Sequence, residues 1–362
     1  MDIVEATRAY EIWLGRHIAI VKDDLEAKHR KMGKGAFEFL RATFYRWAQV
    51  WPALCPELAD APSLLAVGDL HVENFGTWRD AEGRLVWGLN DVDEAAPMPY
   101  AIDLVRLAAS AVVAAREDHL TVAPADACDA ILAGYTAGIK QGGAPFVLEE
   151  SHPALRAMAL SADRAPAAFW ARLTRPKPMR DVPPAMRRLL ARYLPEPKLD
   201  FRVVRRRSGL GSLGRPRFVA LAALDGGWVA REAKAILPSA CFWAAGRPAK
   251  RLHGAALLAR AVRCPDPYVF FTPQWQVRRL APHCSRIALA ELDARRDERR
   301  LLGAMGRETA NIHRGTPAAR RAVLRDLARR KDTWLLKAAQ RMADTLVEDW
   351  QTWRKHLRAL LE

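Results

Sequence analysis

The sequence predicts an α+β fold in two lobes, one mainly helical and one built on an antiparallel sheet. Residues 3–54 and the C-terminal segment carry apolar side chains at helical spacing. Residues 201–236 alternate strand-like runs with glycine-rich turns, and two more strand-like runs follow in 268–277. A polar stretch rich in carboxylates, residues 67–103, lies between short apolar runs. We therefore expect the two lobes to meet around this stretch.

Composition limits the class of protein. The chain has 362 residues, of which half are hydrophobic, so it can bury one large or two moderate cores. Its formal net charge is +16, and much of the excess is arginine, as between Arg320 and Arg330. Such a charge favours acidic partners, including nucleotides and nucleic acid. A solvated arginine-rich face gives the same count, and we favour that interpretation over a nucleic-acid partner.

The cysteines and the N-terminus indicate a cytoplasmic protein. The five cysteines are scattered and form neither a C-x-x-C pair nor a zinc-like spacing with histidine, so reduced thiols are the simplest account. The first residues are acidic and lack the basic start and apolar core of a signal peptide. The most apolar helix candidate, residues 104–115, is interrupted by Arg106 and is too short to span a bilayer.

The carboxylate-rich stretch has a spacing that points to chemistry. Asp69 and Asn74 are five residues apart, as in the D-x-x-x-x-N of a kinase catalytic loop. Asp91 follows after a predicted hairpin, and Asp93 comes two residues later. By that match, Asp69 accepts the proton of the substrate hydroxyl, while Asn74 and Asp91 hold Mg²⁺ and Asp93 is a candidate second ligand.

Two other residues support the same interpretation. The run Gly68-Asp69-Leu70-His71 with Asn74 resembles the loop of aminoglycoside and choline phosphotransferases more than that of protein kinases. In this comparison His71 shapes the catalytic loop. Asp103 resembles the aspartate of the helix beneath the loop, which supports the loop's backbone.

Two alternatives for this stretch remain open. Gly-Asp-x-His also opens metallophosphatase motifs, where Asp and His bind metal, but the later Gly-Asn-His and the further histidines of that family are missing. A turn rich in Asp and Asn with no chemistry is the other alternative.

A second motif lies at residues 209–214, where Gly209, Gly211 and Gly214 form a G-x-G-x-x-G that includes Ser212. The motif alone fits a dinucleotide-binding unit or a phosphate-covering loop between two strands. Pro216 and the strand-like residues after it favour the second, because no helix begins there. The third strand carries Lys234, which we expect to hold phosphates as a point charge while the glycines admit backbone N–H groups. A glycine-rich hairpin without a ligand is the alternative.

Three further polar residues are ambiguous from the sequence. Arg41 is interpreted as a surface residue, with a phosphate contact as the alternative. His313 is interpreted as a packing residue at a helix end rather than a residue of the cleft. Glu232 alternates with Arg231 and Ala233, and the side of the sheet that it faces stays open.

With both motifs in hand, the chain resembles a bacterial family known as domain of unknown function 2252, which is grouped with the protein-kinase-like phosphotransferases. The resemblance implies a two-lobed kinase-like fold. Because the catalytic loop precedes the glycine loop, the fold would be circularly permuted. Residues 1–150 would begin the catalytic lobe, 151–199 would be a helical connector on the surface, 200–285 the nucleotide lobe, and 286–362 helices that pack on the large lobe.

The predicted function is an ATP- and Mg²⁺-dependent phosphotransferase acting on an unidentified hydroxyl acceptor. One departure from the kinase pattern matters, since residues 241–263 contain no acid to pair with Lys234. A catalytically silent nucleotide-binding or scaffold protein is therefore the main alternative, and a basic nucleic-acid-binding protein is the second.

Overall fold

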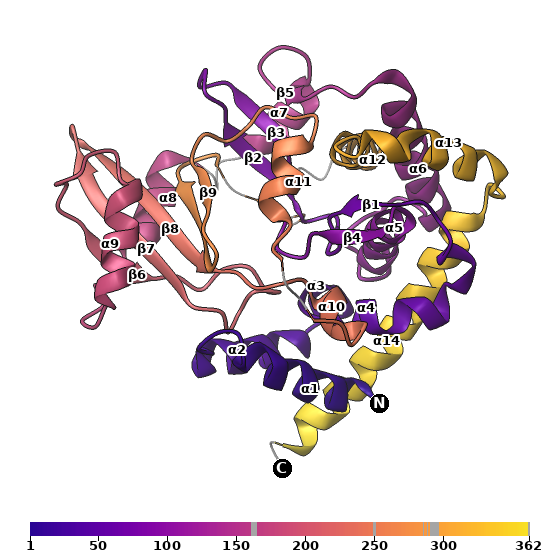
Figure 1. Ribbon diagram of the computed structural model, residues 1–362, viewed down its shortest axis with the longest axis horizontal. Helices are drawn as coiled ribbons and strands as arrows, with labels where there is room; N and C mark the ends of the chain where they lie inside the picture. The colour runs from indigo at the N-terminus through magenta and orange to yellow at the C-terminus, as the bar shows by residue number, and fades with distance from the viewer. Residues whose placement is uncertain (161–164, 249–250, 285, 288, 290–296, 361–362) are drawn as a thin grey trace.

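The computed structural model describes residues 1–160, 165–248, 251–284, 286–287, 289 and 297–360. Parts of the predicted connector, nucleotide lobe and C-terminal segment thus lie outside the described residues. The fold is mixed α+β, as predicted (Figure 1). The helices are α1 Ile3–Gly15, α2 Lys22–Met32, α3 Ala36–Ala42, α4 Phe44–Leu54, α5 Ala101–Arg116, α6 Pro124–Gln141, α7 Pro153–Ala159, α8 Pro166–Thr174, α9 Pro184–Tyr193, α10 Ala240–Ala244, α11 Gly254–Arg260, α12 Glu298–His313, α13 Arg320–Arg329 and α14 Trp334–Ala359.

Within the described residues, the strands form three antiparallel sheets. Their bounds are β1 Ser63–Ala66, β2 Phe75–Arg79, β3 Leu85–Leu89, β4 Ala96–Pro99, β5 Phe146–Val147, β6 Arg202–Arg205, β7 Arg217–Leu224, β8 Gly227–Ala235, β9 Val269–Phe271 and β10 Trp275–Leu280. The largest sheet has five strands in the order β6-β7-β8-β10-β9, and the smaller ones are β1-β4 and β2-β3-β5. The five-stranded sheet projects from the helical part of the molecule (Figure 1).

Helices cover both faces of the five-stranded sheet. On one face Leu190 of α9 packs with Ala220 and Ala233, and on the other Leu173 of α8 packs with Val219. Strand alternation explains this, because successive residues point to opposite faces. We had expected residues 151–199 to be a connector on the surface. Helices α8 and α9 of this segment complete the two small cores of the sheet, whereas α7 packs in the large core through Leu155 and Ala159.

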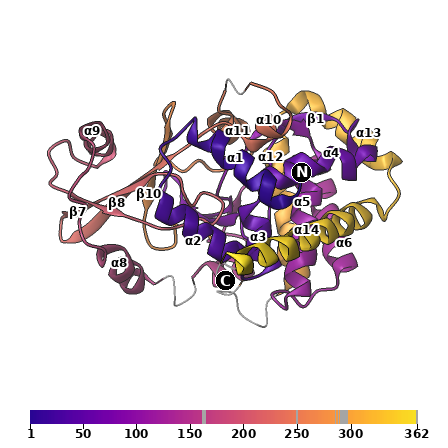
Figure 2. The same cartoon turned by 90° about the horizontal axis from the view of Figure 1, so that it is seen from below.

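The helical part is organised around α5, whose apolar residues are buried all round. The long helix α14 packs along α5 and closes one side of this core (Figure 2). Helices α6 and α12 cross at glycines. A Cβ on Gly134 would lie 2.0 Å from the carbonyl oxygen of Gly303, so glycine is required at this crossing.

The predicted hairpin before Asp91 is present. Strands β2 and β3 pair with Phe75 opposite Leu89, around a turn where Gly83 has φ +77°. This register brings Asn74 beside Asn90, whose N–H donates to the carbonyl oxygen of Asn74 at 3.0 Å. The hairpin therefore joins the two loops that carry the predicted catalytic residues.

Candidate functional site

The backbone in front of Asp69 is held by a buried carboxylate. Asp103, fully buried in α5, accepts hydrogen bonds from the N–H groups of Val67 at 2.7 Å and Gly68 at 2.8 Å. Its Oδ2 also lies 2.8 Å from Nε2 of His313. The predicted support of the loop by Asp103 is confirmed. His313 is a buried partner of this support and does not line the pocket, in agreement with the favoured packing role.

Asp69 is paired with an arginine that the sequence did not single out. Arg106 is fully buried and donates to Oδ1 of Asp69 from Nε at 3.2 Å and from Nη2 at 2.8 Å. Its guanidinium lies 4.6 Å from the ring centroid of Trp47. Burial raises the pKa of Asp69 and outweighs the opposing charge of Arg106. A carboxylate with a raised pKa is a stronger proton acceptor, and a general base needs this property.

Asn74 bonds to both segments that carry predicted catalytic or metal-binding residues. Its Nδ2 donates to the backbone oxygens of Asp69 and Asp91, at 3.0 Å each, and its Oδ1 accepts from the N–H of Asp91 at 2.9 Å. The side chain thus fixes the distance between the two loops. The Oδ1 atom keeps one lone pair for a cation, so the metal role of Asn74 stays a prediction.

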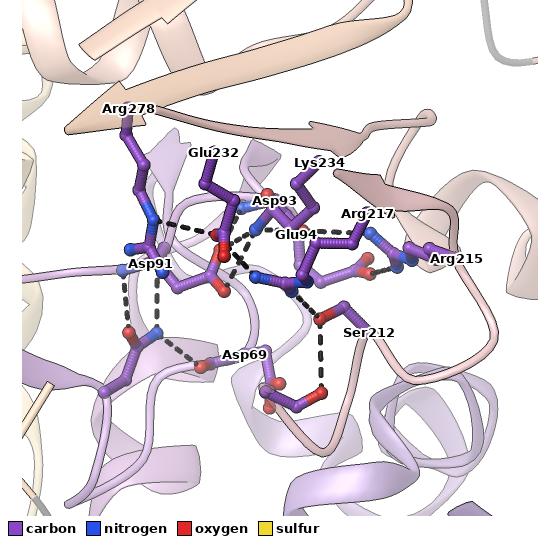
Figure 3. Close-up of polar contacts among 12 residues, drawn as sticks. Asp69, Asp91, Asp93, Glu94, Ser212, Arg215, Arg217, Glu232, Lys234 and Arg278 are labelled. Atoms are coloured by element: carbon purple, nitrogen blue, oxygen red, sulfur yellow. Dashed lines mark hydrogen bonds and ion pairs between the residues drawn. The ribbon is translucent and has the colours of Figure 1, made fainter. Parts of the chain in front are cut away.

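Lys234 faces the carboxylates that follow the hairpin (Figure 3). Its Nζ lies 2.8 Å from Oδ2 of Asp93 and 3.3 Å from both oxygens of Asp91. Burial alone would raise the pKa of Asp91, but the charges of Lys234 and Arg278 hold it below its ordinary value. Burial and the neighbouring charge of Asp91 raise the pKa of Asp93. The pair therefore favours the ionised form of Asp91.

The fit to a magnesium ion rests on two carboxylates. Among the described residues, no group of three or more His, Cys, Asp or Glu side chains has the arrangement of a metal site. Oδ1 of Asp93 is nevertheless buried without a hydrogen-bond partner, and the Asp91 side chain is 43% exposed towards the pocket. Magnesium in phosphate-transfer sites is commonly bound by one or two carboxylates together with waters and phosphate oxygens. Asp91 and Asp93 fit that donor set.

The glycine motif forms a compact turn above Asp69. Gly209 and Gly214 have φ of +73° and +93°, a region that favours glycine. A Cβ on Gly211 would lie 3.7 Å from Oδ2 of Asp69, so the turn approaches the predicted base closely. Three N–H groups already donate to carbonyl oxygens within the turn, namely those of Ser212, Leu213 and Arg215. Fewer backbone donors are therefore free for phosphate than we expected.

Helix α2 holds this turn from below. Lys28, 5% exposed, donates from Nζ to the carbonyl oxygen of Gly211 at 3.2 Å, and the N–H of Val21 donates to that of Gly214 at 2.9 Å. Burial lowers the pKa of Lys28 to about 8. The N-terminal helices thus contribute to the site, which sequence spacing did not reveal.

Glu232 lies on the same face of the sheet as Lys234 but has other partners (Figure 3). It is fully buried and pairs with Arg206 and Arg217 at 2.6 Å each and with Arg278 at 3.2 Å. Burial would raise its pKa, but the three arginines hold it well below its ordinary value. Glu232 therefore pairs with arginines and not with Lys234. It does not take the place of the acidic residue that the kinase pattern places after the lysine.

A second buried network closes the site next to α10. Arg215 donates to Oδ2 of Asp93 at 2.9 Å and to Oε1 of Glu94 at 3.2 Å. Oε2 of Glu94 accepts from the N–H of Ala240 at 2.7 Å, at the start of α10.

Ser212 joins the glycine turn to the sheet, because its Oγ accepts from Nη2 of Arg217 at 2.8 Å. These contacts leave Ser212 occupied by protein groups.

Predicted residues from distant segments border one pocket, which contains about 940 Å³ of space and opens to solvent. The predicted residues that line it are Asp69, His71, Asn74, Asp91, Asp93, Gly209, Gly211, Ser212 and Lys234. Gly214 ends the same turn and packs against Leu25. The sequence did not point to Tyr10, Lys28, Tyr45, Glu73, Arg215 or Arg278, which also line the pocket.

Arg41 lines this pocket too, and its interpretation as a surface residue is wrong. Its side chain is 12% exposed, and its Nη1 lies 2.7 Å from Oε2 of Glu73. Nη1 of Arg286 reaches the same oxygen at 2.9 Å. His71 lies nearby with its Nδ1 buried and unpartnered. Burial and the charges of Arg41, Arg106 and Arg286 lower the pKa of His71 well below its ordinary value, so its imidazole is neutral.

Comparison with known proteins gives a family match over part of the chain. Residues 20–168 match the family described as "Uncharacterized protein conserved in bacteria (DUF2252)". The matched segment contains the catalytic-loop motif and its supporting helix but not the glycine turn or Lys234. Neither the curated proteins nor the solved structures gave a match. The family description names no activity, so any function must be argued from the site. No helix in the described part of the chain is long and apolar enough to cross a membrane.

Proposed function

We propose that the protein is an ATP- and Mg²⁺-dependent phosphotransferase with a permuted kinase-like fold. One observation carries the proposal. Asp69 and Asp91 border the same pocket as the 209–214 turn and Lys234, although more than a hundred residues separate the two segments. Acids on one side and a lysine with glycines on the other are what phosphoryl transfer from a nucleotide needs.

The order of elements supports the fold part of the proposal. The 209–214 turn connects β6 and β7, and Lys234 lies on β8 in the middle of the five-stranded sheet. This succession is that of a kinase nucleotide lobe. The catalytic loop comes earlier in the chain, between β1 and β2, so the lobes would follow one another in the reverse of the usual order.

The proposed step uses the residues as follows. Asp69 takes the proton of the acceptor hydroxyl on Oδ2, since Oδ1 is held by Arg106. The acceptor oxygen then forms a bond to the γ-phosphorus, and the bond from that phosphorus to the β–γ bridging oxygen breaks, releasing ADP. Asp91 and Asp93 would hold magnesium, which offsets phosphate charge when bound. Lys234 would bind phosphate oxygens as a point charge.

A reducing compartment such as the cytosol fits the thiols. All five cysteines are free, and disulfides are rare in cytosolic proteins.

The second candidate is a catalytically silent nucleotide-binding protein. In α10, the first helix after Lys234, there is no acidic residue. Lys234 pairs instead with Asp91 and Asp93, the carboxylates proposed for metal. In a silent protein these ion pairs would persist with nucleotide bound and the metal would not enter.

Two measurements separate the candidates. Thermal shift with ATP, with and without Mg²⁺, reports binding, and release of ADP in a mixed metabolite extract reports turnover. An active enzyme should bind ATP with Mg²⁺, and Asp69→Asn should lower turnover by roughly 10²- to 10⁴-fold while binding is kept. Asp60→Asn, at an exposed aspartate outside the pocket, is the matched control. Binding without any turnover supports the silent protein, and absence of binding contradicts both.

A further inference from the structure

The part of the pocket next to His71 has a chemistry of its own. Arg41, from α3, and Arg286, from the segment after β10, both contact Oε2 of Glu73, while Oε1 of Glu73 accepts from the N–H of Leu289 at 2.9 Å. Two guanidinium groups thus share one carboxylate. We call Arg41, Glu73 and Arg286 the arginine pair with its carboxylate.

This arrangement carries an excess of positive charge beside the proposed base. Burial and the like charge of Arg286 lower the pKa of Arg41 to about 10, against the opposing effect of Glu73. The Nε of Arg41 is buried and has no hydrogen-bond partner. A guanidinium has five N–H donors, so Glu73 does not exhaust the capacity of Arg41. Crowded like charges are relieved when an anion binds between them.

The groups on this side of the pocket argue against a cationic acceptor. The motif Gly68-Asp69-Leu70-His71 with Asn74 resembles phosphotransferases whose acceptors include the cation choline. Here a cation next to Asp69 would also meet Arg41 and Arg286, and Glu73, the carboxylate that these two arginines share, is already bonded on both oxygens. The neutral imidazole of His71 adds no negative charge. Arginine pairs are suited to carboxylate and phosphate groups, which accept from their planar donors.

We infer that the acceptor is an anionic hydroxyl compound, a hydroxy acid or a phosphorylated alcohol, whose charged group binds between Arg41 and Arg286. That the bound anion acts as the phosphate acceptor rests on the proposed phosphotransferase function. The binding of an anion between Arg41 and Arg286 can be tested without that function. With the anionic group held by the arginine pair, the hydroxyl of the same molecule would be directed to the free Oδ2 of Asp69. The arginine pair then selects the substrate and Asp69 performs the proton transfer.

The test is a calorimetric titration without nucleotide. The probes are glycerol 3-phosphate and glycerate, with glycerol and choline as the neutral and cationic comparisons. Both anions should bind, and glycerol and choline should not. The anion with the higher affinity shows whether the site prefers a phosphate or a carboxylate group. Arg41→Gln and Arg286→Gln should each weaken anion binding by roughly 10- to 100-fold, the range expected for a lost charge-assisted hydrogen bond. Arg188→Gln, at an exposed arginine of α9, is the control and should leave the affinity unchanged.

A second variant gives a change of opposite sign. Glu73→Gln keeps the acceptor for the N–H of Leu289 but removes the charge that occupies the two arginines, so anion affinity should rise.

Lys234→Gln tests whether the anion sits at the nucleotide's phosphate site instead. Binding that is lost in Lys234→Gln and kept in Arg41→Gln would overturn the inference. So would binding of choline, or failure of both anions to bind.

Together with the thermal-shift and ADP-release measurements above, these titrations keep the two proposals apart. If ATP with Mg²⁺ fails to bind while the anions behave as expected, the phosphotransferase function is wrong and the anion site stands. If ATP binds and is turned over while Arg41→Gln leaves anion affinity unchanged, the inference about the acceptor is wrong and the function stands.

Discussion

Arg106 donates two hydrogen bonds to a single oxygen of Asp69 from a fully buried position in α5. This contact fixes Oδ1 of the carboxylate, while Oδ2 is on the side towards the pocket. It also ties the proposed base to α5, whose residues 101–114 are all buried. One ion pair is therefore expected to affect both the stability of the protein and the proposed proton transfer.

Removing this arginine should be costly. Arg106→Met leaves Asp69 without its partner in a largely buried position, and we expect a loss of about 3 kcal/mol in the free energy of unfolding, measured by urea denaturation. Arg116→Met on the same helix is the control, because its ion pair with Asp344 is 40% and 59% exposed on the two sides. Such a pair should contribute less than about 1 kcal/mol. Equal losses in the two variants would contradict the role given to Arg106.

The support beneath the loop can be tested by hydrogen exchange. Asp103→Asn replaces an acceptor of two backbone N–H groups by an amide, so the amides of Val67 and Gly68 should exchange faster and stability should fall by about 3 kcal/mol. Tyr135→Phe removes only the hydroxyl that lies 2.9 Å from Nδ1 of His313. Its cost should be about 1 kcal/mol, with little change at the two amides. Unchanged exchange in Asp103→Asn would show that other contacts hold the loop.

Lys28 should give the protein a distinct dependence on pH. Burial lowers its pKa from 10.5 to about 8. Between these values the unfolded chain holds a proton that the folded protein releases, so the contribution of Lys28 to the free energy of unfolding becomes more favourable as pH rises. From about pH 7 to about pH 9.5 the wild type should gain roughly 2 kcal/mol relative to Lys28→Met, measured by urea denaturation at both pH values. A constant difference between the two proteins would mean that Lys28 titrates normally.

The ion pairs of Lys234 predict an effect of magnesium on stability. Lys234→Met removes the cation that Asp91 and Asp93 share and leaves Asp93 with Arg215 alone, which should lower the melting temperature in the absence of metal. Without the lysine, no ammonium group competes with Mg²⁺ for Asp91 and Oδ1 of Asp93, so added Mg²⁺ should raise the melting temperature of this variant more than that of the wild type. The double variant Lys234→Met, Asp91→Asn should lose that gain. An equal change in melting temperature with Mg²⁺ in all three proteins would mean that Asp91 and Asp93 do not bind the metal.

Local pattern was sufficient for much of the fold. Helical spacing predicted helices in the first 54 residues, and Phe37 and Leu40, two of the apolar residues at that spacing, are in the core. The hairpin before Asp91 followed from apolar runs around a turn. The pattern of residues 248–263 predicts one helix, but the part of this segment that the structure describes is helical only over α11. A single apolar run does not determine where a helix begins or ends.

The polar partners in the site could not be read from spacing. Arg106 looked like an interruption in an apolar helix, and only its contact with Asp69, 37 residues away, explains why a charge is buried there. The partners of Glu232 come from β7, β10 and the residue after β6. The side of the sheet that Glu232 faces was left open, and the cross-strand register that supplies its arginines is a tertiary feature. An unexplained arginine in an apolar helix was the one available signal.

A crystal structure of the protein with Mn²⁺ and a non-hydrolysable ATP analogue tests the central claim most directly. The account predicts an anomalous manganese peak against Asp91 and Asp93, with the γ-phosphate between Lys234 and Oδ2 of Asp69. An analogue bound elsewhere on the protein, or a pocket that stays free of both nucleotide and manganese at saturating concentrations, would contradict it.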